Sequence, residues 1–433
     1  ARTGEAVTEL LLREGAHVIA TDRDESKRDA LETRFAERGV EFVFGPHEPI
    51  KGVQLIVVSP GVPLTGPLFQ WAAAEGIPVT GELELASRFC RRPLIAITGT
   101  NGKTTVTSMT GHIVERCGFG GETAGNIGNA LANVVVEGRA KSNEPLVLEV
   151  SSFQLETIDQ FRPHVSVICN LAPDHLDRYR SLEEYYETKT RICMNQTSND
   201  DLWIGPGVAH ECYPVTEAMI RTFDIQEHKR QGLFELEGAI YYRSTDVSGP
   251  FIVPGWSDWL GQVRLNALAA AGAVTSLGIS VDTALQALRD YKTPHHRLEF
   301  VASVKGIRCY NDSKATNVHA TETALQSVGG PVLLIAGGRH KGDSLTPLLS
   351  LVRQKVRVAY LVGESAEMFA EAWRPFIQVE LVRDVREAVH RALKDNEGPG
   401  TLLLSPACAS WDMYKSYEER GDEFVDAVRE AAK

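Results

Sequence analysis

The sequence predicts an α/β protein of three domains, with its most specific motif in the middle of the chain. The chain has 433 residues, a length that suggests about three domains. Short apolar runs alternate with amphipathic helical patterns near both ends, as in doubly wound α/β domains. Between them, an apolar run, a glycine turn and a Lys-Thr pair follow one another. We expect a first domain over residues 1–82, a second over 83–293 and a third over 294–433.

The motif in the middle has the pattern of a phosphate-binding loop. Leu94–Ile97 is typical of a buried strand, and Val106, Met109 and Ile113 have the spacing of a helix. Glycines between them let backbone N–H groups surround phosphate oxygens at the helix N-terminus. Lysine at this position reaches the β- and γ-phosphates, and the next hydroxyl binds Mg²⁺. The predicted loop and helix start contain Gly99, Thr100, Asn101, Gly102, Lys103, Thr104 and Thr105.

The loop is a variant, because the first glycine of the general G-x-x-x-x-G-K-[ST] pattern would fall at Ile97. The alternative interpretation is a plain glycine turn that happens to precede a lysine. We favour the phosphate loop, because Gly-Lys-Thr stands between a predicted strand and a predicted helix.

Composition narrows the class of protein. A formal net charge of −12 argues against a nucleic-acid or anionic-membrane surface. The seven cysteines are odd in number and form no C-x-x-C pair, which favours reduced thiols in the cytosol. No apolar stretch is long enough to span a bilayer. We expect a cytoplasmic monomer that acts on small molecules and has no nucleic-acid or membrane partner.

The first domain has a nucleotide-binding pattern but lacks the strand and glycine turn with which such domains open. We therefore expect a truncated domain in which Gly4 is the last glycine of the missing turn. Asp22 ends the predicted second strand and is a candidate ribose contact, with an ordinary charged loop residue as an equal alternative. The expected elements are a helix around Val7, Leu10 and Leu11, a strand over 17–21, a helix over 26–38, and strands over 42–44 and 54–59.

Two side chains after the phosphate loop suggest a metal site. Glu149 interrupts the apolar strand Leu146–Val150, which is costly unless the carboxylate is paired or bound to a cation. His175 follows the strand Val165–Cys169, and ligands bind beyond the carboxyl ends of parallel strands. We expect Glu149 and His175 to converge on Mg²⁺ beside Thr104, although His175 alone would be an ordinary loop histidine. Lys189 has the pattern of a solvated helix lysine.

The last third of the chain predicts a second doubly wound sheet, because strands and amphipathic helices alternate again. Residues 200–258 are less periodic, with a β-like run at 239–242, and a helix is expected over Asn266–Val274. Charged loops follow several strands of the last third, which suits anionic ligands, although solvated surface charge is the alternative for any one of them. The expected strands are 307–310, 332–336, 356–362, 377–382 and 401–404.

Four motifs together resemble the Mur ligases over nearly the whole chain. Thr98–Thr104 is shared across that superfamily, while Ser151–Glu156, Asn311–Asn317 and Ser405–Gly421 resemble the branch that adds D-glutamate. The resemblance implies Rossmann-like N- and C-terminal domains around a P-loop ATPase-like domain. It also implies an ATP-dependent, ADP-forming ligase of peptidoglycan synthesis that joins D-glutamate to UDP-N-acetylmuramoyl-L-alanine through an acyl phosphate.

The same resemblance implies roles for individual residues. Catalysis would involve Lys103, His175 and Lys189, with two Mg²⁺ ions held by Thr104, Glu149, His175 and a Lys189 carbamylated by CO₂. ATP would contact the phosphate loop, Asn266, Arg297 and Asp312. The uridine-nucleotide substrate would contact Asp22, Arg23, Ser59, Gly61, Asn126, Ser151 and His175. D-glutamate would contact Lys314, Thr316, Lys341, Ser410 and Tyr417.

The chain departs from the family pattern in two further places. The His-Asn-x-x-Asn of the family is replaced by Gln262–Asn266, and Ala172-Pro173 stands before Asp174-His175. A GTPase is excluded because no Asn-Lys pair occurs in the chain, and a nicotinamide oxidoreductase would leave Lys103 unexplained. A folylpolyglutamate synthase-like ligase and an inactive nucleotide-binding paralogue remain alternatives.

Overall fold

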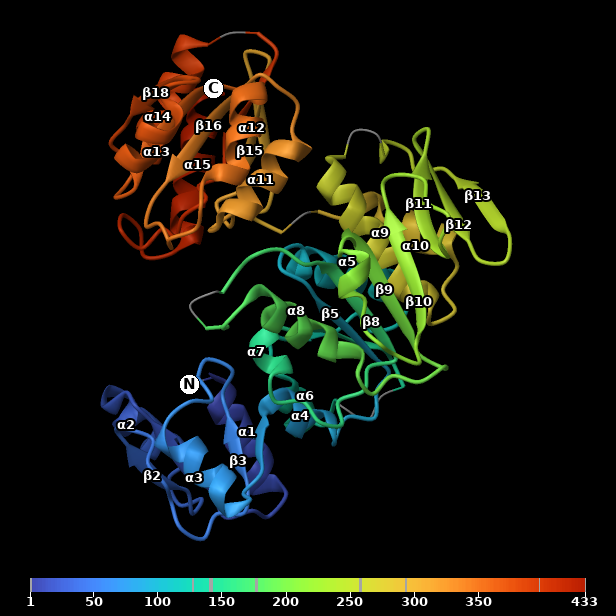
Figure 1. Ribbon diagram of the computed structural model, residues 1–433, viewed down its shortest axis with the longest axis vertical. Coiled ribbons are helices and arrows are strands. Elements are labelled where there is room, and N and C mark those ends of the chain that lie inside the picture. Colours follow the sequence, from blue (N-terminus) through green and yellow to red (C-terminus); the bar gives the residue numbers. More distant parts are fainter. Residues whose placement is uncertain are drawn as a thin grey trace. The chain divides into compact units, whose positions relative to one another are not determined.

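The computed structural model describes residues 2–126, 128–139, 143–175, 178–256, 259–292, 294–396 and 398–432. The chain forms two compact units (Figure 1), one comprising Ala1–Pro254 with Asn266–Arg289, the other Gly255–Leu265 with Asp290–Lys433. The first unit contains the predicted first domain and most of the second. The boundary expected after residue 82 stays a prediction, and Thr293 lies outside the described residues. Among the described helices, none has the length and apolar character that a membrane crossing requires.

The N-terminal part of the first unit contains two separate parallel strand pairs, β1–β2 and β3–β4. The helix expected over 26–38 is shorter, because Glu37 and Gly39 adopt left-handed backbone angles, with φ of 61° and 73°. Gly4 lies in the first turn of α1. The elements are α1 (Arg2–Arg13), β1 (Ile19–Asp22), the 3-10 helix η1 (Glu25–Lys27), α2 (Arg28–Arg34), β2 (Glu41–Phe44), β3 (Ile56–Val58), α3 (Pro67–Glu75), β4 (Val79–Gly81) and α4 (Glu82–Ser87).

A nine-stranded sheet forms the centre of the first unit, in the order β13-β12-β11-β10-β9-β8-β5-β7-β6. The strands from β6 to β11 are parallel to their neighbours, and β12 and β13 are antiparallel. The strands are β5 (Leu94–Thr98), β6 (Thr123–Gly125), β7 (Leu146–Glu149), β8 (Val165–Asn170), β9 (Asp201–Gly207), β10 (Met219–Asp224), β11 (Gly232–Leu236), β12 (Ala239–Arg243) and β13 (Val247–Phe251).

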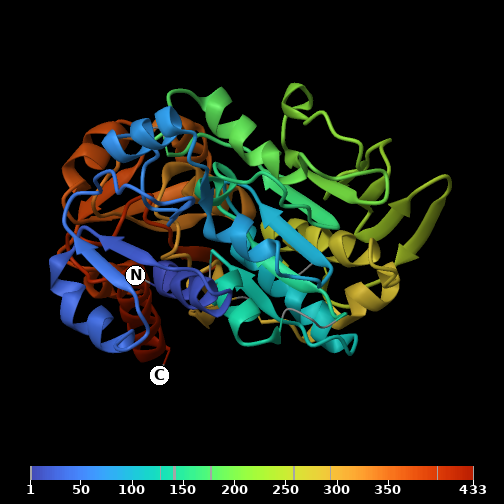
Figure 2. The same cartoon turned by 90° about the horizontal axis from the view of Figure 1, so that it is seen from below.

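The sequence predicted the strands that lie next to the phosphate loop but only β12 among the last five. Of these, β13 has no buried residue, so it lacks the apolar run on which the prediction depends. Figures 1 and 2 show β12 and β13 at one end of the sheet.

Helices cover the central sheet. One buried cluster joins α1, α4 and α6 to the sheet, through residues such as Leu83, Leu131 and Leu148. Helix α5 packs along β5 and β7, and α10 lies beside α5. Gly272 lets α9 approach the Trp203 ring closely, since an added Cβ would lie 2.7 Å from it. The helices are α5 (Lys103–Arg116), α6 (Leu131–Val136), α7 (Ser152–Leu155), α8 (Leu182–Thr190), α9 (Gly261–Thr275) and α10 (Val281–Ala287).

The second unit confirms the predicted doubly wound sheet. Its six strands have the order β14-β15-β19-β16-β17-β18, and only β14, at the edge, is antiparallel to its neighbour. Along β16, Leu334 and Ala336 join one buried cluster while Leu333 and Ile335 join another, so both faces are covered. The strands are β14 (Glu299–Val304), β15 (Ile307–Asn311), β16 (Val332–Gly337), β17 (Val356–Val362), β18 (Gln378–Leu381) and β19 (Gly400–Leu404). The helices are α11 (Val318–Ser327), α12 (Thr346–Lys355), α13 (Ala366–Trp373), α14 (Val385–Asp395) and α15 (Tyr417–Ala431).

Candidate active site

The glycine turn predicted from the sequence joins the carboxyl end of β5 to the N-terminus of α5. Gly99 has φ of 142°, and a Cβ there would lie 2.9 Å from the Cβ of Cys169. Gly102 has φ of 85°, and a Cβ there would lie 2.9 Å from Oδ1 of Asn266. Both positions therefore require glycine, and Asn266 of α9 lies against the loop. The arrangement of strand, turn and helix is the one a phosphate loop requires.

Asn170 holds this loop in place from the end of the neighbouring strand β8. Its backbone O accepts from the N–H of Thr100 at 3.0 Å. Its side chain accepts from the Asn101 N–H at 2.9 Å and donates to the Asn101 O at 3.0 Å. The Thr100 hydroxyl donates to the O of Ala172 at 3.1 Å. The loop is therefore fixed to the chain after β8.

Two lysines meet at the start of the loop. Lys103 Nζ donates to the O atoms of Gly99 and Thr100, both at 2.8 Å. Lys189 Nζ donates to the same Gly99 O at 2.9 Å. Burial, reinforced by the charge of Lys103, lowers the pKa of Lys189 well below its usual value of 10.5.

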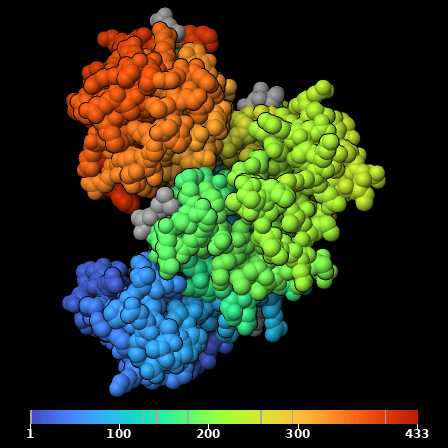
Figure 3. Space-filling model, viewed as in Figure 1, coloured from blue at the N-terminus to red at the C-terminus, as the bar shows by residue number. Residues whose placement is uncertain are grey.

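The prediction from the sequence pattern that Lys189 is solvated is wrong, since the residue is only 2% exposed. Helix α8 turns Tyr185 and Lys189 toward the phosphate loop and leaves Glu183 and Glu187 exposed. Figure 3 shows in green the broad surface of the middle of the chain, to which α8 belongs. Lys189 is the last buried position of a helix with weak apolar periodicity, so the pattern gave no signal of its burial.

Glu149 ends β7, beside β5, and is buried as the sequence predicted. Its Oε1 accepts from the Asn126 Nδ2 at 2.9 Å, and its Oε2 is buried without a hydrogen-bond partner. A buried carboxylate oxygen without a donor fits a hard cation. Across the described ranges, no group of three His, Cys, Asp or Glu side chains is placed to hold a metal. Mg²⁺ needs no such group, because it is commonly held by one or two carboxylates together with substrate phosphates and waters.

His175 lies among aromatic side chains of α7 and α8. Its ring meets Phe153 edge-on at 4.9 Å and Tyr185 at 6.1 Å between centroids. Its backbone has φ of 55°, and its N–H donates to Oδ1 of Asp174 at 2.9 Å. A left-handed histidine is uncommon and marks a position that its surroundings define. Its convergence with Glu149 on one metal stays a prediction.

A cavity lies between the turn after β3 and helix α7, with Ser59, Val62, Phe153 and Arg178 among its lining residues. Arg178 pairs with both carboxylate oxygens of Glu156, through Nε at 2.9 Å and Nη2 at 2.6 Å. It also lies 4.3 Å above the Phe153 ring and donates to the Val62 O at 3.4 Å. Arg178, which joins the N-terminal turn to α7, was not among the residues predicted from the sequence.

The other residues predicted to bind the nucleotide substrate lie in different settings. Ser59 lines the cavity, and Val62 N–H donates to the Ser59 O at 2.9 Å across the turn that contains Gly61. Ser151 caps α7, accepting from the Gln154 N–H at 3.3 Å. Asp22, followed by Arg23, ends β1 and pairs with Lys27 at 3.1 Å. Their contacts with a substrate stay predictions.

In the second unit, Asp312 follows β15 and is buried. It accepts from the Ser405 hydroxyl at 2.9 Å and from the Leu298 N–H at 3.2 Å. Burial nonetheless raises the pKa of Asp312 to about 7. Arg297 lies between His296 and Leu298, both left-handed, with φ of 64° and 46°. Asp312 therefore helps to fix the turn that carries Arg297.

Arg420 joins two loops of the second unit that carry predicted D-glutamate contacts. It is 1% exposed and donates to the hydroxyl and O of Ser313 at 3.0 and 2.8 Å and to the Cys408 O at 3.1 Å. The Ser313 hydroxyl donates to the Tyr417 O at 2.8 Å, and Lys314 Nζ lies 3.6 Å above the Tyr417 ring. The predicted contacts Lys314, Thr316, Ser410 and Tyr417 lie in or beside these loops, and Lys341 follows β16.

Three family models match the chain. They are described as the Mur ligase MurD-like N-terminal domain, over residues 1–81, the Mur ligase middle domain, over 97–246, and the Mur ligase glutamate ligase domain, over 296–408. A curated protein of Pelotomaculum thermopropionicum, named UDP-N-acetylmuramoylalanine--D-glutamate ligase, is 41% identical, with 99% of this chain and 95% of that protein covered. One of the same name from Geotalea uraniireducens is 40% identical, again over 99% and 95% of the two chains.

Solved structures show the same fold at low identity. A pseudomurein peptide ligase type C from Methanothermus fervidus has a TM-score of 0.59 and 17% identity, covering 100% of this chain and 97% of that one. The E. coli FolC complex with DHPP and ADP has a TM-score of 0.59 and 15% identity, covering 86% and 100%.

Proposed function

This chain belongs to the Mur ligase family, and we propose that it is an ATP-dependent, ADP-forming ligase that joins D-glutamate to UDP-N-acetylmuramoyl-L-alanine in peptidoglycan synthesis. The observation that supports this most directly is the cluster around the phosphate loop. There Lys103 and Lys189 share the Gly99 O, and Glu149 has a buried, unpartnered oxygen.

The reaction needs activation because a carboxylate is a poor acyl donor. The alanyl carboxylate attacks the γ-phosphate of ATP, so a new O–P bond forms, the bond to ADP breaks, and an acyl phosphate results. The amine of D-glutamate then attacks the acyl carbon, an amide forms, and phosphate leaves with loss of a proton. Charge on the transferring phosphoryl group is stabilised by groups placed in advance.

Several of the chain's own residues would serve the first step. Lys103 exchanges its two backbone carbonyls for phosphate oxygens, which bind a cation more strongly. Thr104 and Glu149 would hold Mg²⁺, which would neutralise charge on the phosphates. Arg297 and Asp312 contact ATP, as does Asn266 beside Gly102. Asn126, which donates to Glu149, contacts the muramoyl-alanine part together with His175.

Lys189 carries a carbamate in this proposal. Its lowered pKa favours the neutral amine, whose lone pair attacks CO₂; an N–C bond forms and one proton is released. The carbamate would supply the oxygens that a bare ammonium lacks and, with His175, would hold a second Mg²⁺.

A rescue experiment tests the carbamate. Lys189→Ala should lose most activity while staying folded, and short carboxylates such as acetate in the millimolar range should restore part of it, as a weak unanchored ligand would. Lys229→Ala, which removes an exposed lysine, is the control and should be nearly silent. Rescue by alkylamines would instead indicate a cationic role, and full activity of Lys189→Ala without rescue would refute the carbamate.

D-glutamate would be bound in the second unit by Lys314, Thr316, Lys341, Ser410 and Tyr417, where cations suit its two carboxylates. The ligase acts as a monomer in the cytoplasm in this proposal, where reduced thiols fit the seven free cysteines.

One assay separates this function from its alternatives. The protein is incubated with ATP and either D-glutamate plus the muramoyl nucleotide or L-glutamate plus a folate. We expect phosphate release and amide formation only with the first pair. Activity only with the second pair would assign a folylpolyglutamate synthase-like ligase, the alternative that the FolC fold keeps open. Activity with neither would favour an inactive nucleotide-binding paralogue.

A further inference from the structure

A buried carboxylate on α4 has no role in the reaction described above. Glu84 has no exposed surface, and its Oε2 accepts from three consecutive backbone N–H groups. These belong to Asp159, Gln160 and Phe161, at 2.9, 3.0 and 2.9 Å. Its Oε1 accepts from Arg88 Nε at 2.8 Å. Charge-assisted bonds of this kind are strong, so Glu84 fixes the backbone of the loop after α7.

The carbonyls of that same segment hold the chain that follows α8. Asn195 Nδ2 donates to the O atoms of Asp159 and Phe161, at 2.7 and 3.1 Å. Arg191 donates to the O atoms of Leu155 and Ile158, at 2.9 and 2.7 Å. The segment after α7 therefore donates its N–H groups to Glu84, and its carbonyls accept from the side chains of Arg191 and Asn195, which follow α8.

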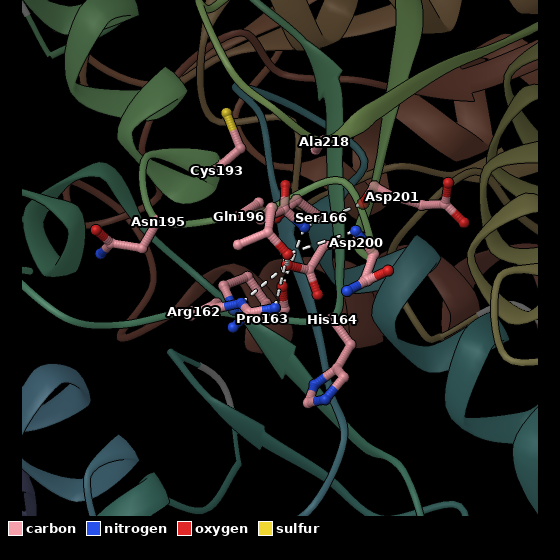
Figure 4. A network of polar contacts seen from close by, with 12 residues as sticks. Arg162, Pro163, His164, Ser166, Cys193, Asn195, Gln196, Asp200, Asp201 and Ala218 are labelled. Atoms are coloured by element: carbon pink, nitrogen blue, oxygen red, sulfur yellow. Dashed lines mark hydrogen bonds and ion pairs between the residues drawn. The ribbon is translucent and has the colours of Figure 1, made fainter.

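A neighbouring polar network extends this connection (Figure 4). Gln196 Nε2 donates to the Pro163 O at 3.0 Å, and Arg162 Nε donates to Asp200 at 2.8 Å. The Thr197 N–H donates to the same Asp200 oxygen at 2.8 Å. The chain from Arg191 to Asp200 is thus joined at several points to the chain from Leu155 to Pro163.

Lys189 stands two residues before Arg191, at the end of the helix that these contacts hold, and its Nζ reaches the Gly99 O at 2.9 Å. We propose that Glu84 is a positioning residue that sets the place of Lys189 against the phosphate loop, acting through the loop 159–161 and the side chains of Arg191 and Asn195. Its catalytic consequence rests on the proposed function, in which Lys189 takes part in ligation.

The position of Glu84 in the chain also links the N-terminal region to the segment after α7. Helix α4 begins directly after β4, the last strand of the N-terminal region. At Gly81, which ends β4, an added Cβ would lie 2.3 Å from the Thr157 hydroxyl of the same segment. The N-terminal region and the chain that follows α8 therefore both contact the segment from Leu155 to Phe161.

Glu84→Gln tests the proposal, because it preserves volume and removes the charge that the three N–H groups share. The first readout is acetylation of Lys189 by acetic anhydride in CO₂-depleted buffer without substrates, measured by mass spectrometry with Lys103 as internal reference. We expect a rise of several-fold in Lys189 acetylation relative to Lys103. Hydrogen exchange should also rise at residues 159–161 and at the end of α8.

The second readout is kinetic. A displacement of about 1 Å at a catalytic group lowers turnover steeply, so we expect kcat to fall on the order of tenfold or more, with the KM for ATP nearly unchanged. Glu82→Gln is the matched control. It removes a buried carboxylate from the same helix, but Glu82 accepts from the Ala132 N–H at 2.7 Å and thus holds α6. Its effect on Lys189 acetylation should be less than about twofold.

The outcomes separate the inference from the proposed function. Equal Lys189 acetylation in Glu84→Gln and Glu82→Gln would overturn the inference, whatever the ligase activity. Raised acetylation in Glu84→Gln alone would support it even if the protein proved not to be a ligase, because this measurement uses no substrate. If Glu84→Gln fails to fold, Asn195→Ala replaces it: raised Lys189 acetylation supports the inference, and unchanged acetylation overturns it.

Discussion

Lys103 and Lys189 donate to one and the same carbonyl oxygen, that of Gly99, from 2.8 and 2.9 Å. The two ammonium groups come from different helices, α5 and α8, and one of them is buried. Burial of Lys189 and the charge of Lys103 both act against a second positive charge. The Gly99 O thus accepts from a cation, Lys103, and from the amine of Lys189, whose lowered pKa favours its neutral form.

Lys103→Ala should abolish ligation, because the lysine offsets phosphate charge throughout transfer. The measurement is phosphate release with ATP, D-glutamate and the muramoyl nucleotide. Arg116→Ala, an exposed position in the last turn of the same helix, should release phosphate at nearly the wild-type rate. Near-wild-type release by Lys103→Ala would remove the phosphate loop from the reaction.

Arg297→Ala should lower kcat on the order of a hundredfold, since a fixed donor to developing phosphate charge contributes about that much. The dissociation constant for the muramoyl nucleotide, measured by calorimetry, should stay within about twofold. An equal loss of nucleotide-substrate binding would move Arg297 into the first-substrate site.

Asp312 should make the protein less stable as pH rises. Its pKa is raised to about 7 in the folded state, above the 3.8 of the unfolded chain, so the folded state binds more protons between these values. The contribution of Asp312 to the free energy of unfolding is therefore fully present below about pH 4. It is lost as the pH rises from there through about 7, at up to about 1.4 kcal/mol per pH unit.

Thermal unfolding of the ligand-free protein between pH 5 and 8 measures this effect, with Asp312→Asn as the comparison. The variant should show a smaller fall of Tm over that range than the wild type. Identical pH profiles would mean that Asp312 titrates at its ordinary pKa.

Arg420→Lys should raise the KM for D-glutamate at least about tenfold while leaving the KM for ATP nearly unchanged, because lysine cannot span Ser313 and Cys408 at once. Arg420→Ala should be partly rescued by added guanidinium. A parallel rise in both KM values would show a general loss of structure and not a local change in the two loops that carry the predicted D-glutamate contacts.

The strands and the phosphate loop could be predicted because each depends on local signals. Leu94–Ile97, Gly102 and Lys103 lie together in the chain, and their pattern alone specifies strand, turn and helix. Glu149 was also identified, because a carboxylate inside an apolar strand is conspicuous.

Lys189, Glu84 and Arg420 could not be assigned in the same way. Each is held by partners far away in the chain. The separation is 75 to 77 residues for Glu84 and its three N–H donors, 90 for Lys189 and Gly99, and 107 for Arg420 and Ser313. A single sequence contains no signal for such a contact, because the residue itself is typical of an exposed helix. The exposed strand β13 and the edge strand β14 were missed for a related reason, since neither is a continuous apolar run.

The close contact between Gly99 and Cys169 gives the phosphate loop a built-in chemical reporter. Cys169 is 3% exposed beneath the loop, and burial raises the pKa of its thiol to about 12. Only a thiolate that solvent reaches is alkylated, so alkylation of Cys169 requires the loop to separate from β8. The alkylation rate of Cys169 should therefore measure how often the phosphate loop separates from β8.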